Sequence, residues 1–419
     1  MVEKLRAIIL GAGYRGRAYA DYAQAHPDEF EIAGVADPVQ ARVIPASHYW
    51  DDWRTCLDEC PSADVVVIAM PDAFHHDAAI AALQRGYHLL LEKPIATTEE
   101  GCREVIDVAL KEHKLVLVGH VLRYTAYFAH IKAIIDSGEL GEVVSIAHQE
   151  SAGFWKVAHS FVRGNWANSD SGSPIVLSKC SHDLDLFVWW LAGRKCLRVS
   201  SFGSLMHFCS ENQPKGATAR CVDCPPEIER KCVWSARNLY VDHDELKYLF
   251  ADHSREAMEK LIATTDYGRC VYQANNNVPD HQAVNMEFEG GVTVSHVMTG
   301  FTAKNIRTTR IALTRGEIVG DGENLEVCRF DGNPVETGVP MFYRIPNRSR
   351  HGGGDFNLVS EMIRIIRRND GDEICETTRQ TLESHLIGFA AERSRLAGGK
   401  VVEIERGDEF SANFPENMV

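Results

Sequence analysis

Short apolar segments alternate with amphipathic segments throughout the first third of the chain, and no other feature restricts the fold as strongly. The intervening stretches, such as residues 75–85 and 98–111, have the apolar spacing of helices. Uninterrupted apolar runs are typical of strands covered on both faces, and a strand–helix repeat predicts a doubly wound parallel sheet. The five expected strands are residues 5–10, 31–36, 65–69, 88–91 and 115–118.

After residue 119 the pattern changes to one of period two, which is typical of a largely antiparallel sheet with one face toward water. A chain of 419 residues exceeds what one hydrophobic core usually organises. We therefore predict an α/β protein with a parallel-sheet domain at residues 1–122 and an α+β domain at residues 123–419. In the second domain we expect strands at 143–149, 283–288, 292–298 and 310–314, and helices at 131–137, 181–191, 356–366 and 378–396.

The charge and hydropathy of the chain restrict its partners. A formal net charge of −15 argues against binding to nucleic acid, because proteins that bind it carry a basic surface. No apolar run approaches the ~20 residues of a membrane-spanning helix. The first residues also lack the pattern of a signal peptide. We expect a cytoplasmic protein without a membrane partner.

A glycine-rich sequence, Gly11-Ala12-Gly13-Tyr14-Arg15-Gly16, directly follows the first expected strand and opens a helix. Its glycines suit a tight turn, close approach of the backbone to a pyrophosphate, and close helix–strand packing. The helix N-terminus offers N–H groups to phosphates. Asp37, at the end of the second strand, suits the ribose hydroxyls of NAD and repels the 2′-phosphate of NADP. We predict NAD rather than NADP; in the alternative, Asp37 only begins a turn before Pro38.

The fourth expected strand ends in Glu92-Lys93-Pro94. Ligands of open α/β sheets bind beyond the carboxyl ends of the strands. A lysine beside an oxidised nicotinamide has its pKa lowered by like charge and desolvation. Such a lysine can accept the proton of a substrate hydroxyl during hydride transfer. We predict this role for Lys93; the alternative is a surface corner between strand and loop.

Further motifs follow in a characteristic order: Met70-Pro71-Asp72-Ala73-Phe74-His75, Ser137-Gly138-Glu139-Leu140-Gly141 and Lys179-x-x-His182-Asp183-Leu184-Asp185. Together with the glycine motif, Asp37 and Glu92-Lys93-Pro94, they resemble the Gfo/Idh/MocA dehydrogenases, the family of glucose–fructose oxidoreductase and inositol dehydrogenase. The resemblance spans nearly the whole chain. It implies a Rossmann domain followed by an open, mostly antiparallel sheet that carries the substrate site and packs in a homodimer or homotetramer. It also implies that Lys93 and His182 are catalytic and that Met70, Pro71, His75 and Glu92 contact the cofactor.

The chain departs from the family pattern near the expected substrate site. Many relatives have an aspartate four residues before the histidine and a glycine two before it, where this chain has Ser178 and Cys180. Lys179 is the nearest replacement, although an ammonium accepts no proton unless its pKa is lowered. The relatives' Trp-Arg pair near the nicotinamide is replaced by Trp166-Ala167, with Arg163 upstream as a substitute.

The remaining candidates are polar or aromatic residues near the expected domain crossing and at the start of an apolar helix. His182 lies in the first turn of that helix, where it can face a cleft; a capping or packing role is the alternative. Asp185 can bind or orient substrate hydroxyls. Arg123 and Trp166 are expected beside the cofactor. The residues predicted to bind substrate are Lys93, Tyr124, Arg163, Trp166, Lys179, His182 and Asp185.

Three cysteines gather in a polar, proline-containing stretch, as Cys221-x-x-Cys224 followed by Cys232. In a reducing compartment such a group suggests a structural zinc site more than disulfides. His207 or Cys209 would supply the fourth ligand. Free thiols or a cluster at a protein interface are the alternatives.

These inferences predict hydride transfer between a secondary alcohol of a sugar or polyol and NAD, with Lys93 as proton acceptor. The substrate class rests mainly on the resemblance. One alternative is a redox-assisted glycoside hydrolase, in which NAD is recycled within each turnover. Another is a non-catalytic sensor of NAD(H), which the loss of an aspartate at Ser178 would fit but which would need neither Lys93 nor His182.

Overall fold

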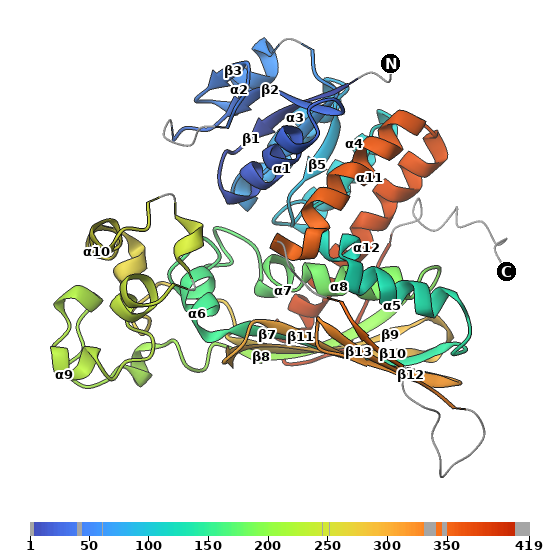
Figure 1. Cartoon of the computed structure of the whole chain (residues 1–419). Coiled ribbons are helices and arrows are strands. Elements are labelled where there is room, and N and C mark those ends of the chain that lie inside the picture. Colours follow the sequence, from blue (N-terminus) through green and yellow to red (C-terminus); the bar gives the residue numbers. More distant parts are fainter. Residues whose placement is uncertain are drawn as a thin grey trace.

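The computed structural model contains two sheets with helices packed between them (Figure 1). It describes residues 4–39, 44–60, 62–244, 246–250, 252–330, 341–345 and 350–406. The N-terminal sheet lies at one end of the molecule and a larger sheet lies at the other. The predicted α/β class, with a parallel first sheet and a mostly antiparallel second sheet, is confirmed.

The N-terminal sheet is parallel and has the strand order β3-β2-β1-β4-β5-β6. This is the order of a Rossmann sheet, which binds dinucleotides where the strand order reverses, between β1 and β4. All five predicted strands are confirmed to within one residue; the unpredicted β3 is a short, partly exposed edge strand without an apolar run. The strands are β1 (Leu5–Leu10), β2 (Phe30–Ala36), β3 (His48–Trp50), β4 (Val65–Ile68), β5 (His88–Leu91) and β6 (Val116–Val118).

Helices flank this sheet and follow the expected amphipathic segments. In the longest of them, the hydroxyl of Thr98 accepts the N–H of Gly101 at the N-terminus, and Lys111 lies in the last turn, where a cation suits the helix dipole. Its face with Cys102, Val105 and Ile106 is buried. The four helices are α1 (Tyr14–Ala25), α2 (Trp53–Glu59), α3 (His75–Gln84) and α4 (Glu99–Lys111).

The second sheet has the order β14-β13-β12-β11-β7-β10-β9-β8-β15 and is antiparallel except between β7 and β10. Buried and exposed residues alternate along β10, as predicted from the period-two pattern. The strands are β7 (Val143–Gly153), β8 (Cys196–Ser204), β9 (His281–Phe288), β10 (Val292–Thr302), β11 (Ile306–Leu313), β12 (Gly316–Gly320), β13 (Asn324–Arg329), β14 (Met341–Arg344) and β15 (Val402–Glu403).

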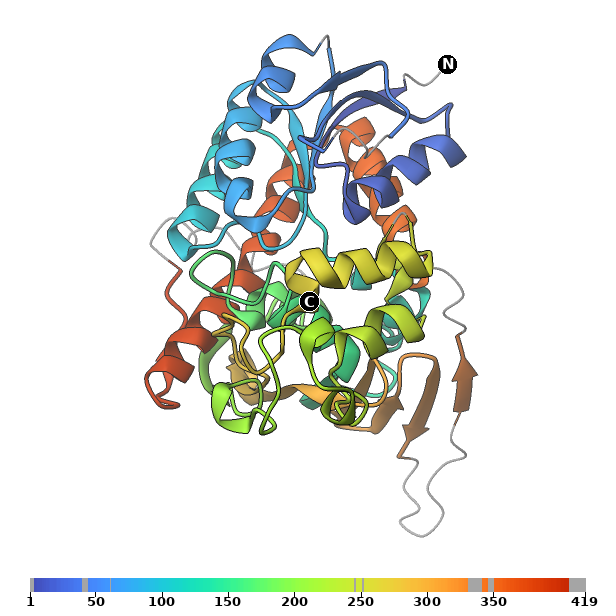
Figure 2. The same cartoon turned by 90° about the vertical axis from the view of Figure 1, so that its left-hand side faces the viewer.

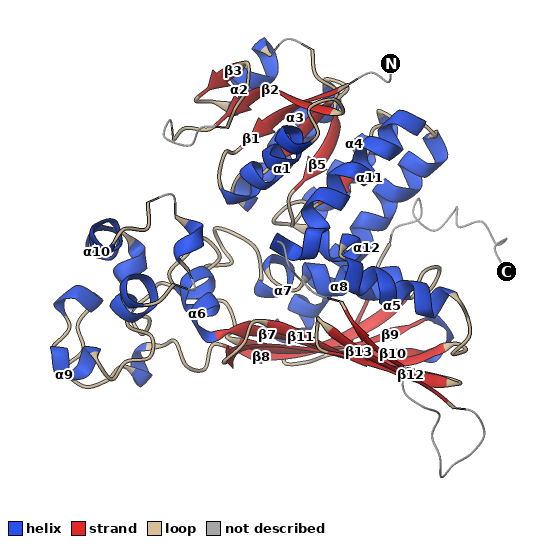
Figure 3. Ribbon diagram, in the orientation of Figure 1, coloured by secondary structure: helices blue, strands red, loops and turns tan. Residues whose placement is uncertain are grey.

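Helices cover one face of this sheet and leave its other face without a covering layer in the described part of the chain (Figure 3). The covered face of this sheet is the one on the side of the Rossmann domain. The helices on this side of the sheet are α5 (Ala126–Asp136), α7 (Ile175–Ser178), α8 (Ser181–Trp190) and α12 (Gly371–Leu396), and they are joined in sequence by α11 (Gly354–Arg368), which packs on α1.

One of these C-terminal helices belongs to the core of the N-terminal domain. Leu358, Val359 and Met362 of α11 are fully buried in a cluster with Ile9 and Tyr19. The predicted division at residue 122 is therefore wrong for α11, which returns from the end of the chain to pack on α1. Apolar periodicity shows that a helix has a buried face but not which core buries it.

An insertion between β8 and β9 projects to one side of the sheet (Figure 2). It contains the predicted cysteine-bearing loop, together with short helical elements that the sequence pattern did not indicate. Its α-helices are α9 (Pro226–Glu229) and α10 (Arg255–Thr264), and it packs near α6 (Phe154–Val157), which follows β7.

Candidate functional site

The glycine loop between β1 and α1 has the geometry of a dinucleotide cradle. Gly11 has a φ of +98°, and a side chain there would lie 2.6 Å from the carbonyl oxygen of Ala69. A side chain on Gly16 would lie 2.0 Å from the carbonyl oxygen of Gly11. A side chain on Gly13, by contrast, would enter open space, with no atom within 4 Å. Gly11 and Gly16 are thus required for packing, whereas Gly13 leaves room for a ligand against the backbone at the helix N-terminus.

Asp37 lies at the end of β2 beside this loop and shapes it. Its carboxylate accepts the N–H of Ala12 at 2.7 Å and the N–H of Val39 at 2.7 Å. The N–H of Ala12 therefore points at Asp37. The Asp37 carboxylate lies next to the glycine loop, where an acidic residue can bind the adenosine ribose. The glycine loop and Asp37 together therefore fit an adenine dinucleotide.

Glu92, at the end of β5, is buried and surrounded by cationic and hydroxyl groups. It accepts hydrogen bonds from Arg15 Nε at 2.5 Å and from Tyr19 Oη at 2.6 Å. Burial alone would raise the pKa of Glu92, but the charge of Arg15 and these bonds lower it below its usual value. Arg15 also donates to Asp355 of α11 at 2.7 Å. Arg15 thus joins the glycine loop, β5 and α11.

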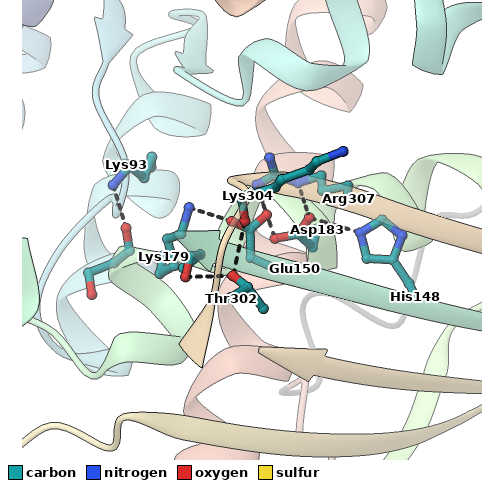
Figure 4. A network of polar contacts seen from close by, with 10 residues as sticks. Lys93, His148, Glu150, Lys179, Asp183, Thr302, Lys304 and Arg307 are labelled. Atoms are coloured by element: carbon teal, nitrogen blue, oxygen red, sulfur yellow. Dashed lines mark hydrogen bonds and ion pairs between the residues drawn. The ribbon is translucent and has the colours of Figure 1, made fainter. Parts of the chain in front are cut away.

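Lys93 follows Glu92 and reaches across to the second domain. Its Nζ donates to the carbonyl oxygen of Ser178 at 2.6 Å (Figure 4). The same atom lies 4.9 Å from the centre of the Trp166 ring. Burial lowers the pKa of Lys93; the carboxylates of Asp72 and Glu92 oppose this, and the charge of Lys179 adds to it. The peptide bond between Lys93 and Pro94 is cis.

The loop after β4 carries Met70, Pro71, Asp72 and His75. The buried carboxylate of Asp72 accepts the Trp166 Nε1–H at 3.1 Å and the Ser173 hydroxyl at 3.1 Å. The buried ring of His75 contacts the carbonyl oxygens of Pro94 at 2.7 Å and Met70 at 2.9 Å. His75 therefore ties the loops after β4 and β5 together, while Met70 is half-buried and Pro71 is exposed.

Two residues of α8 differ sharply in their surroundings. Asp185 is only 1% exposed and forms a bidentate pair with Arg123, at 2.5 and 2.7 Å, and a contact with His120 Nδ1 at 3.0 Å. His182 Nδ1 is buried without a hydrogen-bond partner among the described residues. Burial, followed by the charge of Lys93, lowers the pKa of His182 well below its usual value, so the ring is neutral at pH 7. The carboxylate of Asp185 thus has partners within the protein, whereas His182 Nδ1 has none among the described residues.

Lys179 belongs to a network of ion pairs on the covered face of the second sheet (Figure 4). Its Nζ lies 2.5 Å from Glu150 Oε1, and Glu150 Oε2 lies 2.7 Å from Arg307, its direct cross-strand neighbour. Arg307 also pairs with Asp183 at 2.5 Å, and Asp183 contacts His148 at 3.0 Å. Lys179 is therefore held by a buried carboxylate of the second sheet.

One compact group of three potential metal ligands occurs in the described residues: Cys180, Asp183 and His296. All three are buried. Arg307 already pairs with Asp183, and a guanidinium at that distance repels a metal cation. We therefore interpret this group as part of the buried network rather than as a metal site.

Comparison with known protein families matches both halves of this architecture. Residues 5–120 match the Gfo/Idh/MocA oxidoreductase family, NAD-binding Rossmann fold, and residues 132–227 match the C-terminal alpha/beta domain of the same family. The chain belongs to the Gfo/Idh/MocA family. The resemblance inferred from the motifs, including an NAD-binding Rossmann domain, is confirmed.

Curated relatives within the Gfo/Idh/MocA family are distant. YteT of Bacillus subtilis, whose name describes it as an oxidoreductase, is 25% identical over 386 residues, 85% of this chain and 88% of its own. The inositol 2-dehydrogenase of Streptomyces avermitilis is 27% identical over 207 residues, 48% of this chain and 57% of its own. No helix in the described part of the chain is long and apolar enough to cross a membrane.

Solved structures of other proteins share this fold over nearly the whole chain. A levoglucosan dehydrogenase in complex with NADH and levoglucosan has a TM-score of 0.71 at 18% identity, over 96% of this chain and all of its own. The WlbA dehydrogenase of Chromobacterium violaceum, in complex with NADH and UDP-GlcNAcA, has a TM-score of 0.63 at 16% identity, over 96% of each chain. These similarities show the fold.

Two predicted substrate residues lie in different surroundings from those expected. Arg163 is 5% exposed and points into the insertion, where it donates to the carbonyl oxygens of Arg269 and Trp234, each at 2.7 Å, and to Cys221 Sγ at 3.6 Å. Its predicted contact with substrate stays a prediction, and the structure shows Arg163 bonded within the insertion. Tyr124 packs partly buried against the core of the first domain, and burial raises the pKa of its hydroxyl above the usual range.

The predicted fourth zinc ligands also lie elsewhere. His207 packs among aromatic rings, with Nε2 3.3 Å from the Tyr272 hydroxyl, and Cys209 Sγ contacts the carbonyl oxygen of Met206 at 3.5 Å. Neither residue lines the cavity that Cys221, Cys224 and Cys232 share. The fourth ligand predicted at His207 or Cys209 stays a prediction. The structure places a different cysteine, Cys270 of a later segment, on this cavity.

Three residues near Lys93 escaped the sequence analysis. Lys156 of α6 forms no ion pair with a described residue; burial, with the charges of Lys179 and Lys93, lowers its pKa to about 8. His385 of α12 accepts the N–H of Ile95 at 3.0 Å and so positions the loop after Lys93. Asp72 stands inside a quoted motif and could have been chosen there. Lys156 and His385 carry no local signal, because only tertiary packing brings them to Lys93.

Proposed function

We propose that this protein transfers a hydride between a secondary alcohol of a sugar or polyol and the nicotinamide of NAD, with Lys93 as proton acceptor. The observation that carries the proposal is the position of Lys93. It follows β5 at the ligand-binding edge of the Rossmann sheet, and its Nζ reaches Ser178 of the second domain at 2.6 Å. A lysine there adjoins both a cofactor on the first domain and a substrate on the second.

NAD, when bound, supplies the hydride acceptor for alcohol oxidation. The chain's own residues then manage the proton. As the C–H bond of the alcohol carbon gives up a hydride, the hydroxyl proton passes to neutral Lys93 Nζ and a carbonyl forms. His182, neutral and with an unsatisfied buried Nδ1, can donate to or accept from the same hydroxyl. Trp166 lies beside the Lys93 ammonium and limits the access of water.

The substrate class follows from the relatives and the site together. Inositol 2-dehydrogenase and levoglucosan dehydrogenase are named for polyhydroxylated rings. Lys156, Lys93 and His182 offer polar groups that suit several neighbouring hydroxyls. Ion pairs within the protein occupy the side chains of Asp185, Arg123 and Lys179. These three residues would therefore support the structure around the site rather than bind the substrate.

Asp37 supports NAD over NADP. Its carboxylate stands beside the cradle, fixed by two backbone N–H groups, where a 2′-phosphate would meet a negative charge. Comparison of kcat/KM for the two cofactors on one substrate checks this preference, and a preference for NADP would contradict it.

A single-turnover measurement tests the function. Purified protein is mixed with NAD and a panel of sugars, polyols and glycosides; NADH absorbance is followed and products are identified. An oxidised product formed with stoichiometric NADH supports the proposal. Glycoside cleavage without net NADH would instead indicate redox-assisted hydrolysis. NAD binding with no reaction on any compound of the panel would favour a sensor.

The pH dependence of oxidation should shift in opposite directions in two variants. Neutral Lys93 is the active form, so kcat/KM rises with pH through a pKa that lies below the usual lysine value. Asp72→Asn removes a charge that raises this pKa, and Lys179→Met removes one that lowers it. The inflection should move down in the first variant and up in the second, each by about one pH unit. Lys111→Met, on the exposed end of α4, is the control; shifts in the same direction would contradict the assignment of Lys93.

The uncovered face of the second sheet supports self-association into a homodimer or homotetramer. Phe202, Ala283, Val297 and Gln149 are aligned on that face by the strand register. Phe202 is 58% and Val297 is 40% exposed. Apolar side chains in such a row are typical of a surface that another subunit covers. Light scattering on the purified protein tests this, and a monomeric mass would contradict it.

A further inference from the structure

The insertion between β8 and β9 brings four cysteines around one cavity. Cys221, Cys224, Cys232 and Cys270 all line it. Its unfilled space is about 320 Å³, including the part open to solvent. None of the four thiols forms a disulfide. The cavity is apart from Lys93 and the glycine loop, and the proposed hydride transfer makes no use of it.

Backbone pairing between distant segments creates this arrangement. An isolated antiparallel bridge joins Arg220 to Arg269 and brings together the two segments that carry Cys221 and Cys270, which both line the cavity. The N–H of Cys270 also donates to the carbonyl oxygen of Ala219 at 2.9 Å. A short turn brings in Cys224, and α9 leads on to Cys232. The fold therefore supplies a fourth sulfur from a segment far along the chain.

A buried cation faces this cluster without a carboxylate partner. Arg163 forms no ion pair with any described acidic residue, and its side-chain partners are Cys221 Sγ, at 3.6 Å, and the hydroxyl of Tyr240. Its Nη1 is buried without an acceptor in hydrogen-bonding geometry. A buried guanidinium is costly unless an anion balances it. Metal-bound thiolates would supply that negative charge.

We propose that Cys221, Cys224, Cys232 and Cys270 form a four-thiolate metal centre whose net negative charge is balanced by Arg163. Four thiolates are the ligand set of structural zinc sites and also of iron–sulfur clusters. Four protein ligands close the coordination shell, so the centre is structural rather than catalytic. Binding deprotonates the thiols and stabilises the insertion, because the unfolded loop contains no preformed site.

The distances between the sulfur atoms differ in what they favour for zinc and for an iron–sulfur cluster. No three of these sulfur atoms lie within 4.8 Å of one another in the described structure. Zn–S bonds of ~2.3 Å in a tetrahedron require closer sulfurs, so zinc would draw the loops together. A cluster of several iron atoms would fit a wider arrangement. Metal analysis therefore identifies the occupant, while the cysteine set is common to both.

The centre would also fix one wall of the proposed substrate site. Arg163 holds the carbonyl of Trp234, and the Trp234 ring packs 5.6 Å from that of Phe154, which begins the helix carrying Lys156. The chain continues from Arg163 to Trp166, whose ring lies beside Lys93. Loss of the metal should therefore disturb Trp166 and Lys156 without removing a catalytic group.

Metal analysis of the full chain, purified anaerobically and without chelators, tests the proposal. We expect about one zinc per chain, or iron with acid-labile sulfide and a visible absorption band. Cys270→Ser should retain roughly tenfold less metal than the wild type. Cys209→Ser is the matched control, because this thiol is in the same insertion but outside the cavity, and its metal content should be unchanged.

A second measurement keeps the test independent of folding of the variant. An organomercurial added to the wild-type protein should release the metal as the cavity thiols react, detected by a metal-binding dye. Wild-type protein that holds no metal after isolation or after reconstitution with zinc, or with iron and sulfide, would overturn the proposal. So would Cys270→Ser protein as fully loaded as the wild type. Neither outcome bears on hydride transfer, which the NADH measurement tests separately.

Discussion

Replacement of Lys93 by alanine should lower kcat for alcohol oxidation by about 100- to 10,000-fold, the usual contribution of a positioned general base. The reason is the location of Nζ, between the cofactor edge of β5 and Ser178 of the second domain. The dissociation constant for NADH should change little, because the glycine loop and Asp37 are untouched. Stopped-flow absorbance and fluorescence titration measure the two quantities. Lys111→Ala, an exposed lysine of α4, is the control.

The Lys93→Arg variant distinguishes a role of Lys93 in proton transfer from a role that requires only its positive charge. Arginine keeps the positive charge but does not deprotonate in this pH range. If Lys93 accepts the proton, the arginine variant should be as impaired as the alanine variant. Restoration of activity by arginine would show that Lys93 acts only as a charge. An alanine variant that is folded by circular dichroism and retains more than about a tenth of kcat would contradict the base role altogether.

Replacement of Asp185 by alanine should destabilise the protein by about 3–5 kcal/mol, since it leaves a buried cation unpaired. Asp185 is 1% exposed and is the carboxylate that pairs with the Arg123 side chain, which is itself 15% exposed. Urea unfolding measures the free energy. The exposed Asp136, paired with Lys132 on α5, is the matched control, and its replacement by alanine should cost about 0.5 kcal/mol or less.

The pH dependence of this stabilisation follows from the same pair. Burial would raise the pKa of Asp185, but Arg123 and His120 lower it to about 2. A carboxyl whose pKa is lowered by folding stabilises the native state above its unfolded value, near 4, and this stabilisation is lost as the pH falls toward 2. The difference between wild type and Asp185→Ala should therefore shrink from pH 5 to pH 2. A loss below about 1 kcal/mol at pH 7, with a raised KM, would instead support the sequence-based role in substrate binding.

Some residues of the candidate site can be identified from the neighbouring sequence, and others cannot. Gly11, Gly13 and Lys93 could be identified from position alone, because a turn after a strand and the end of a parallel strand have defined chemical uses. Glu150 and Arg307 could not, because their pairing depends on the register between β7 and β11. Period-two patterns show which residues share a face, but they do not show which strands are neighbours.

The same limit explains the cysteine insertion and the domain boundary. Spacing revealed Cys221, Cys224 and Cys232 as a group, whereas Cys270 joins them only through the bridge between Arg220 and Arg269. Arg163 looked like a substrate residue because of its place in the chain, and tertiary packing turns it toward the sulfurs. Likewise α11 reads as an amphipathic helix, and only the folded chain shows that it completes the Rossmann core.

By itself, the sequence determined the strand–helix alternation of the first domain, the glycine cradle, the position of Lys93 and membership in a family. These depend on local periodicity and on turns a few residues long. Only the tertiary structure decided that Asp185 and Lys179 are held in ion pairs and that Lys156 lies near enough to Lys93 for their charges to interact. It also supplied the fourth cysteine. Side chains that are distant in the chain, such as Arg123 and Asp185 or Glu150 and Arg307, meet through burial and strand register, which the order of residues does not encode locally.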